Sequence, residues 1–462
     1  MLFRSIEAQG NLDDETMRKE RDMRTKQVKK GTGKKKKGWM IACLIAVTAA
    51  VGGTLWFWNG TRQKTAKLEH ITAITVTTQE TYPAGEKLGE VKVTAEGVDE
   101  AGNQVIRELP TEEYVITPEQ VPEHGHEFEI TAALTEDEEI RAEATALIGR
   151  EEVQRYEIGR QDPEAVQAVL YENGDLEIAG NGAVKNFKEH EIPWQEDGVL
   201  YLTWIDPAAE IERMDDWFSG NTDFVAMLCP VPDTVRSMVR TFYGCTAMEA
   251  VPEMGTAVYL EDLTACYSGS AVRDGGELPG NLRTAEEAYR DCKALVYAAD
   301  ASACVQLANM KNCYNGCTAL SDTSTPDSVT NLQGAYQNCL NITRASIPSK
   351  AENLTSAYSG CTGLTAVEGE IPASCTSMSG AFKDCKFLEG ELMIHCTTSS
   401  LSGVFSGAAK NSHGLTVSLS WERKTTDYQT EEEILGSLAE SIEKQAKVDG
   451  SNITVKRIEQ NQ

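Results

Sequence analysis

The feature that most constrains this chain is an internal repeat of 22–25 residues in its second half. Three copies show it clearly: Leu332-Gln-Gly-Ala-Tyr336-Gln-Asn-Cys339, Leu354-Thr-Ser-Ala-Tyr358-Ser-Gly-Cys361 and Met378-Ser-Gly-Ala-Phe382-Lys-Asp-Cys385. An aliphatic residue is followed four positions later by an aromatic residue, then by Gly, Asp or Asn, and then by Cys. The recurring period predicts a solenoid with one coil per repeat, because so short a coil closes a core only by stacking on its neighbours.

The candidate site residues occupy two positions of this repeat, and we expect both positions to hold the coils together. The aromatic residue recurs at Phe218, Phe242, Tyr267, Tyr289, Tyr314, Tyr336, Tyr358, Phe382 and Phe405. The Cys three residues later is present as Cys245, Cys292, Cys317, Cys339, Cys361 and Cys385. We expect the aliphatic and aromatic residues to share one face of a short helical turn, and Cys to act as a small hydrophobe inside a narrow coil.

The cysteines have a second possible role, because an extracellular location permits disulfides. In a regular stack, however, equivalent side chains of adjacent coils run parallel about 4.7–4.9 Å apart, so their Cβ atoms do not converge. Buried free thiols are therefore the prediction, with disulfides as the alternative. A metal site is not expected, since Cys313 and Cys317 come nearest to a ligand pair but are too widely spaced for Cys-x-x-Cys.

The repeats resemble BspA-type leucine-rich repeats of bacterial surface proteins. The segment Val329-Thr-Asn-Leu-Gln-Gly-Ala-Tyr-Gln-Asn-Cys339 is also similar to the related lipoprotein-associated surface repeat. The resemblance covers roughly residues 165–411, since the segment from Ala168 to Val184 resembles the β-hairpin that begins such arrays. It implies a surface-displayed array that binds a partner.

This chain departs from the pattern of that family in two places. The copies near Phe218 and Phe405 lack the Cys, as terminal coils often do, and the stretch around Tyr267 is irregular. The register of the repeat near Tyr267 is therefore open.

An uncharged run near the N-terminus predicts one membrane span. Residues 1–37 hold 12 Lys+Arg and 6 Asp+Glu, in a chain whose net charge is -28. No charged residue occurs from Trp39 to Trp58, and about 20 residues at 1.5 Å each cross a hydrocarbon core of about 30 Å. We expect this helix to contact the lipid bilayer with the N-terminus cytoplasmic. A cleaved signal peptide is the alternative, although its basic region would be unusually long.

The remaining segments follow from strand and helix patterns. Alternating strands with turns over residues 68–150 predict a β-sandwich. Within it, Tyr82-Pro-Ala-Gly-Glu-Lys-Leu88 resembles bacterial Ig-like domains, a resemblance that implies a spacer. At the other end, Thr430-Glu-Glu-Glu433 is a capping box before an amphipathic helix flanked by strands. The predicted fold class is thus multidomain: a transmembrane helix, an all-β Ig-like sandwich, and a leucine-rich-repeat-type solenoid with a β-hairpin N-cap and a small α/β C-terminal cap.

The predicted segments divide the chain into an N-terminal part and an extracellular part. The N-terminal part is a cytoplasmic basic tail (1–37), the transmembrane helix (38–58) and a linker (59–67). The extracellular part is the sandwich (68–150), a linker (151–164), the hairpin N-cap (165–205), the repeats (206–411) and the β-α-β cap (412–462). We expect a single-pass protein of a bacterial cell membrane with a large extracellular C-terminal region.

Candidate chemistry is sparse in this sequence. Glu123-His124-Gly125-His126-Glu127 offers imidazoles and carboxylates, but a zinc site needs three or four convergent ligands, so we expect a polar turn. The segment from Asp99 to Asn103 lacks the ligand repeat of a calcium loop. No nucleophile elbow, His-Glu-x-x-His or phosphate loop is present. No enzyme activity, cofactor or metal is expected, and the acidic balance argues against nucleic acid as a partner.

Two functions fit the sequence. The first is adhesion or recognition of an extracellular protein or glycan by the repeat array, with the sandwich as a stalk. The second is a structural or sensory scaffold that holds a partner within the same cell envelope. The identity of the ligand is not readable, because outward residues of a solenoid vary independently of its core pattern.

Overall fold

The computed structural model describes residues 68–397, 400–422 and 430–458. These residues form two compact units. The first holds residues 68–77, 91–116 and 131–143, and the second holds residues 78–90, 117–130 and those from 144 onward. The predicted tail at 1–37, the predicted transmembrane helix at 38–58 and the linker at 59–67 lie outside the described residues.

The first unit is built on a small antiparallel sheet. Strands β1 (Leu68–Thr77), β3 (Lys92–Asp99) and β4 (Gln104–Glu108) pair in the order β1-β3-β4. Exposed and buried residues alternate along β3, which places Val93 and Ala95 in the core, as the two-residue period of a strand requires. The core of this unit is completed by Leu68, Ile74, Leu109, Tyr114, Ala132 and Leu134.

A second sheet contributes to both units. Its strands lie in the order β2-β7-β6-β5 and span Thr81–Pro83 (β2), Arg141–Gly149 (β7), Glu127–Leu134 (β6) and Tyr114–Thr117 (β5). The 3-10 turn η4 (Thr111–Glu113) precedes β5. Residues 68–150 thus form two sheets, of which the first lies in the first unit and the second has residues in both units. The Ig-like sandwich over these residues stays a prediction.

The second unit begins with a five-stranded sheet in the order β14-β12-β10-β9-β8. The strands span Glu152–Glu157 (β8), Val166–Tyr171 (β9), Asp175–Gly180 (β10), Tyr201–Ile205 (β12) and Ala226–Met227 (β14), with η5 at Pro163–Ala165 and a small pair at Gly182–Ala183 (β11) and Ala209–Glu210 (β13). The expected hairpin is the antiparallel pair β9–β10, but β12 and β14 extend it as parallel strands. The sheet therefore turns directly into the first coils of the repeat.

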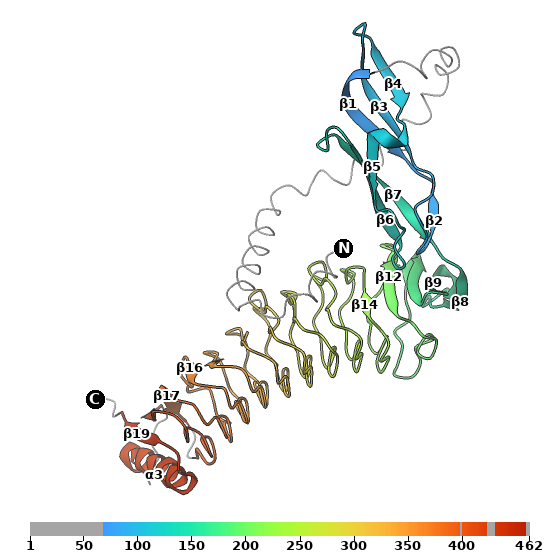
Figure 1. Cartoon of the computed structure of the whole chain (residues 1–462). Helices are drawn as coiled ribbons and strands as arrows, with labels where there is room; N and C mark the ends of the chain where they lie inside the picture. Colours follow the sequence, from blue (N-terminus) through green and yellow to red (C-terminus); the bar gives the residue numbers. More distant parts are fainter. Residues whose placement is uncertain (1–67, 398–399, 423–429, 459–462) are drawn as a thin grey trace. The chain divides into compact units, whose positions relative to one another are not determined.

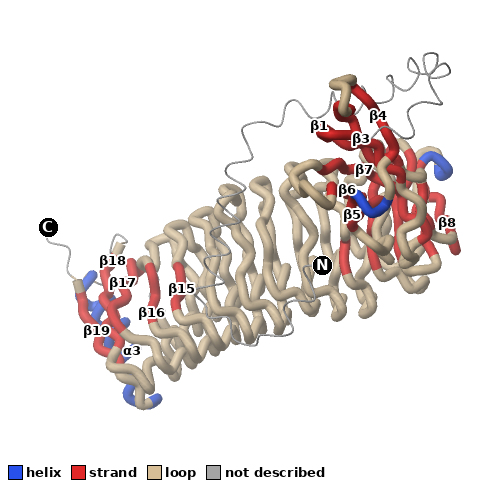
Figure 2. The backbone as a smooth tube through the Cα atoms, turned by 45° about the horizontal axis from the view of Figure 1, so that its top comes forward, coloured by secondary structure: helices blue, strands red, loops and turns tan. Residues whose placement is uncertain are grey.

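Each repeat forms one coil, and the coils stack in sequence between β14 and the C-terminal strands (Figures 1 and 2). Short parallel strands join neighbouring coils, such as β15 (Arg344–Ser346) with β16 (Ala366–Glu368). Single-residue parallel bridges continue a second ladder through Asn309, Asn331 and Asn353. Most of each coil is turn and loop, as the tan tube of Figure 2 shows. We call the aromatic residue of each copy its ring residue and name each coil after it.

The backbone around each ring residue is a series of turns and not the short helix expected from the sequence. The residue two positions before the ring is left-handed in every coil, for example Asn312 (φ 53°) and Ser356 (φ 55°). The residue two positions after it, the Gly, Asp or Asn of the pattern, is left-handed as well, for example Asn338 (φ 62°) and Gly360 (φ 79°). A right-handed helix cannot contain these angles, and each non-glycine residue costs about 1–2 kcal/mol there.

Hydrogen bonds between coils offset this cost. In the Tyr336 coil, the amides of Leu332, Gly334, Tyr336 and Asn338 donate to carbonyl groups of the next coil at 2.8 Å. The amides between them close turns within the coil, as when the amide of Cys339 donates to the carbonyl of Tyr336 at 3.1 Å. Alternate amides thus point along the stack, which satisfies the buried backbone without a long strand.

The C-terminal end closes the stack with a parallel sheet and a helix. Strands β17 (Gly390–Cys396), β18 (Leu415–Trp421) and β19 (Ile453–Arg457) pair in that order. Helix α3 (Glu431–Asp449) begins with a capping box between Thr430 and Glu433 and ends at Gly450 in the left-handed conformation. Its buried face is Ile434, Leu435, Leu438, Ala439, Ile442 and Ala446.

The predicted fold class is wrong, because it includes a transmembrane helix. Over the described ranges the chain consists mainly of strands and turns, and its one α-helix, α3, is amphipathic with charged residues on its exposed side. Among these residues, none of the helices combines the length and the apolar composition that a membrane crossing requires. The run from 38 to 58 suggested a span by composition alone and lies outside the described residues.

The stacked turns predict unequal effects of two glycine substitutions. Gly220 and Gly360 both have φ of +79°, but a Cβ on Gly360 would lie 2.4 Å from Asn338 Oδ1, whereas nothing lies within 4 Å of one on Gly220. Gly220→Ala should lower the free energy of unfolding by about 1–2 kcal/mol through the left-handed angle alone. Gly360→Ala should lower it by roughly 1–3 kcal/mol more, because Asn338 must move. Urea unfolding of the full chain measures both, and equal losses would contradict the stacking of these positions.

Candidate functional site

The structure places the nine predicted ring residues in one stacked column. Ring centroids of successive coils are 5.2–5.8 Å apart from Phe218 to Phe405. All nine rings are buried. At the N-terminal end the column continues through Trp217 to Trp194, whose rings meet edge to face at 5.3 Å. These rings fill the core, so they are not available to a ligand.

Tyrosine hydroxyl groups cross the inside of the coil to the opposite backbone. Tyr289 donates to the carbonyl of Gly275 at 2.8 Å, and Tyr358 donates to the carbonyl of Ser346 at 2.7 Å. Burial raises the pKa of both hydroxyls well above the ordinary value. Each tyrosine thus contributes both stacking and a hydrogen bond that a buried polar group requires.

The six predicted cysteines form a second column, and each thiol has a hydrogen-bond partner that sequence reasoning missed. The thiol donates to the carbonyl of the ring residue one coil earlier: Cys245 to Phe218 at 3.2 Å, Cys292 to Tyr267 at 3.0 Å, Cys317 to Tyr289 at 2.9 Å, Cys339 to Tyr314 at 3.1 Å, Cys361 to Tyr336 at 2.9 Å and Cys385 to Tyr358 at 3.1 Å. Burial raises the pKa of Cys245 and of Cys361 to about 12. The column is therefore a set of protonated donors that pack between coils.

The predicted site residues therefore build the stack, and outward positions are left exposed. The outward residues differ from coil to coil: directly after the ring they are, for example, Tyr243, Arg290, Asn315, Gln337 and Lys383. Large apolar side chains are exposed at several of them, namely Leu228, Tyr243, Val258, Tyr259, Val305, Leu340 and Phe387. A shallow hollow also lies over Gly269 and Ala271, bordered by Thr246, Asp291 and Lys293. The array thus offers varied surfaces on a constant core.

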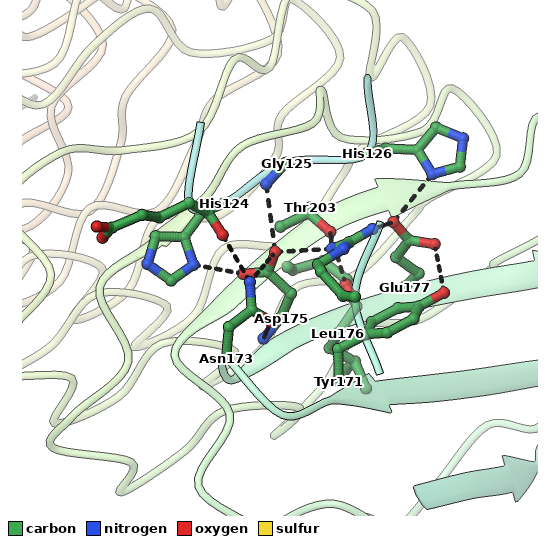
Figure 3. A network of polar contacts seen from close by, with 12 residues as sticks. His124, Gly125, His126, Tyr171, Asn173, Asp175, Leu176, Glu177 and Thr203 are labelled. Carbon is green, nitrogen blue, oxygen red and sulfur yellow. Dashed lines mark hydrogen bonds and ion pairs between the residues drawn. The ribbon is translucent and has the colours of Figure 1, made fainter. Parts of the chain in front are cut away.

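A buried ion-pair network lies where the segment 117–130 meets the first sheet of the second unit (Figure 3). The guanidinium of Arg150 binds Asp175 on β10 at 2.7 Å and also contacts Glu177 on the same strand. All three side chains are at most 5% exposed. Burial alone would raise the pKa of Glu177, but hydrogen bonds from His126 and Arg150 lower it below its ordinary value. Tyr171 adds a hydroxyl donor to Glu177 at 3.1 Å.

The two histidines of the expected polar turn complete this network. His124 Nδ1 lies 2.8 Å from Asp175, and His126 Nδ1 lies 2.9 Å from Glu177. Each ring also contacts an aromatic residue of β12: His126 stacks on Trp204 at 4.3 Å, and His124 lies tilted by 32° against Tyr201 at 4.1 Å. Within the described residues, no group of three or more His, Cys, Asp or Glu side chains is arranged to hold a metal ion. The histidines therefore act as a clamp between chain segments.

A second histidine cluster lies on the C-terminal strands. His395 Nε2 is 2.8 Å from Glu370, while its Nδ1 is 3.0 Å from both Glu422 and Ser420. Ser, His and Glu recur in hydrolytic triads, but here the Ser420 hydroxyl also lies 3.0 Å from Glu422. A carboxylate at that place opposes the negative charge that acyl transfer develops. The hydrogen bond to Glu370, with a further one to Glu422, raises the pKa of His395 above its ordinary value.

Comparison with known proteins yields distant structural likeness only. No family model matches the chain, and no curated protein matches it significantly. Solved structures that resemble it include a leucine-rich repeat protein from Eubacterium ventriosum (14% identity, TM-score 0.34, covering 66% of this chain and 84% of that one). The pneumococcal vaccine antigen PcpA follows at 12% identity and a TM-score of 0.24, covering 65% and 98%.

A leucine rich cell surface protein from Faecalibacterium prausnitzii resembles the chain at 14% identity and a TM-score of 0.21, covering 64% of this chain and 94% of that one. Such values do not assign the chain to a family. The assignment of a leucine-rich-repeat-like solenoid therefore rests on the coil geometry described above.

The thiol column predicts unreactive cysteines in the folded protein. None of the twelve described cysteines forms a disulfide in the structure, and eleven of them are buried. A water-soluble thiol reagent should therefore modify them slowly in buffer and fully in denaturant, because reaction needs an exposed thiolate. Thiol titration of the purified chain, with and without prior reduction, measures this. Eight or more thiols that become reactive only after reduction would show disulfides in place of the free column.

The His395 cluster predicts a stabilisation that depends on pH. The pKa of His395 is raised above 6.5 in the folded chain, so its contribution is full below that value and is lost as the pH rises through the folded-state pKa. His395→Gln should cost about 0.5–1 kcal/mol at pH 5.5 and much less at pH 8.5. Urea unfolding at both pH values measures the difference. His190→Gln, at an exposed histidine, is the control, and a loss at position 395 that does not change with pH would contradict the cluster.

Proposed function

We propose that the repeat array is a binding module of a bacterial surface protein. The observation that carries this proposal is the division of each coil into repeated inward residues and varied outward residues. Ring residues and thiols occupy the core in coil after coil, whereas outward positions change and expose side chains such as Tyr243, Tyr259 and Phe387. Tyrosine and arginine exposed on a rigid scaffold are the residue types that dominate protein-binding surfaces.

The finer form of the proposal names adhesion or partner recognition through BspA-type repeats. The sequence resemblance over residues 165–411 supports it, because surface display and binding are what that resemblance implies. The ligand class is an extracellular protein or a glycan. The varied outward residues support recognition of one partner by a particular set of coils, since each coil presents its own side chains.

The deciding experiment removes the array from a displayed chain. Deleting residues 206–411 should lower binding to immobilised host matrix, to other cells or to polysaccharide at least tenfold, because it removes all outward coil positions. Deleting only residues 331–352 is the matched control: it removes one 22-residue coil in phase, since Asn331 and Asn353 occupy equivalent bridge positions. Equal surface levels are checked on intact cells with an antibody to a C-terminal tag, because the C-terminal region is the part expected outside. Undiminished binding after the large deletion would refute the proposal.

A scaffold within the cell envelope is the second candidate. The Arg150 network favours it, because His124 and His126 join the segment 117–130 to Asp175 and Glu177 of the first sheet, as a rigid spacer requires. Crosslinking in intact cells separates the two candidates. A crosslinked envelope protein that is lost with residues 206–411, without loss of external binding, would favour the scaffold.

A further inference from the structure

Three large apolar side chains are exposed on the loops of two coils that are separated by one intervening coil. Val258, Tyr259 and Val305 are 50%, 51% and 76% exposed. The two valines occupy equivalent places: the amide of Val258 donates to the carbonyl of Thr256 at 2.8 Å, and the amide of Val305 donates to that of Ala303 at 3.0 Å. This tight three-residue turn projects each valine outward. We call Val258, Tyr259 and Val305 the loop patch.

The two loops that carry the loop patch lie on either side of one intervening coil and both contact it. Asn281, in the intervening coil, donates its side-chain amide to the carbonyl of Val258 at 2.5 Å. A Cβ on Gly280 would lie 3.2 Å from the carbonyl of Ala303. Gly280 is the equivalent of the two valines in that coil, so no side chain stands between them. Across two coil spacings the valines are roughly 10 Å apart, a separation that one apolar side chain of a partner can bridge.

Arginine side chains border the loop patch. The guanidinium of Arg236 lies 5.2 Å from the centre of the Tyr259 ring. Arg236 and Arg283 each lie 3.5 Å from Glu261, so two guanidinium groups share one carboxylate. In the flanking coils the equivalent positions are Asp233 and Asp327, both exposed, and their carboxylates make the rim polar. Exposed valines next to tyrosine and arginine, inside a polar rim, have the composition of an interface centre.

We propose that the loop patch docks a polypeptide segment that presents an apolar side chain next to a carboxylate. The apolar side chain covers the two valines and removes their methyl groups from water, which favours binding. The carboxylate of the partner pairs with Arg236 or Arg283, because Glu261 carries one negative charge for two guanidinium groups. A glycan is the poorer occupant, because its hydroxyls would face valine methyl groups and lose their hydrogen bonds to water. This inference rests on the proposed function and names the partner for one part of the array.

A random library of twelve-residue peptides displayed on phage is the probe, selected on the full chain. Wild type should enrich peptides that combine Leu, Ile, Phe or Trp with Asp or Glu. The variant Val258→Ser/Tyr259→Ser/Val305→Ser should bind the enriched peptides at least tenfold more weakly. The matched control, Leu228→Ser/Leu340→Ser/Phe387→Ser, changes three other exposed apolar residues and should leave binding unchanged. Arg283→Glu should weaken the binding of acidic peptides and leave the binding of neutral peptides unchanged.

Several outcomes would overturn the inference. These are no enriched peptides, enriched peptides that are basic or lack apolar residues, and equal binding to wild type and the loop-patch variant. All substituted residues are exposed, so unchanged melting temperatures confirm that the variants fold. The proposed function fails separately, when deletion of residues 206–411 leaves binding to cells and matrix intact.

Discussion

The carbonyl group of each ring residue is the acceptor on which the stack depends. In the Tyr314 coil this carbonyl accepts the amide of Cys317 at 3.0 Å and the thiol of Cys339 at 3.1 Å. One bond closes the turn within the coil, and the other joins it to the next coil. Cysteine suits the position because it is small and apolar yet still donates, which valine and alanine cannot do. Where serine replaces it, the hydroxyl of Ser270 contacts the thiol of Cys292 at 3.5 Å instead.

The sequence was sufficient to predict the coil stack but not the backbone within it. Period and residue type identify the inward column, because burying an aromatic residue every 22–25 positions leaves few other arrangements. The left-handed residue two positions before the ring carries no such signal. It is Asp216, Arg240, Glu287, Asn312 or Ser356 as readily as Gly334, since neighbouring coils, and not the residue's own preference, hold it there. The expected helical turn was wrong for this reason.

The Arg150 network was missed because its partners are far apart in sequence: 25 and 27 residues for Arg150, and 51 for each histidine. One local signal was present: His124 and His126 are two residues apart, as are Asp175 and Glu177. Residues i and i+2 share one face of an extended chain, so two such pairs can meet side by side. Opposite chemistry at equal spacing is a weak pattern on its own. Burial makes these pairs important for stability, because removing one partner of a buried ion pair typically lowers the free energy of unfolding by about 3–5 kcal/mol.

Inward and outward residues of each coil have different roles, and this division separates stability from recognition. Five successive tyrosines from Tyr267 to Tyr358 stack at 5.2–5.4 Å, and phenylalanine takes the place at both ends of the column. The rings, thiols and alternate amides of the column thus pack against or hydrogen-bond the neighbouring coil. A ligand can then engage only side chains that the stack does not need, such as Tyr259 and Val305. Substitutions there change recognition while the hydrogen bonds that set the coil spacing stay intact, so one scaffold can carry different binding surfaces without loss of fold.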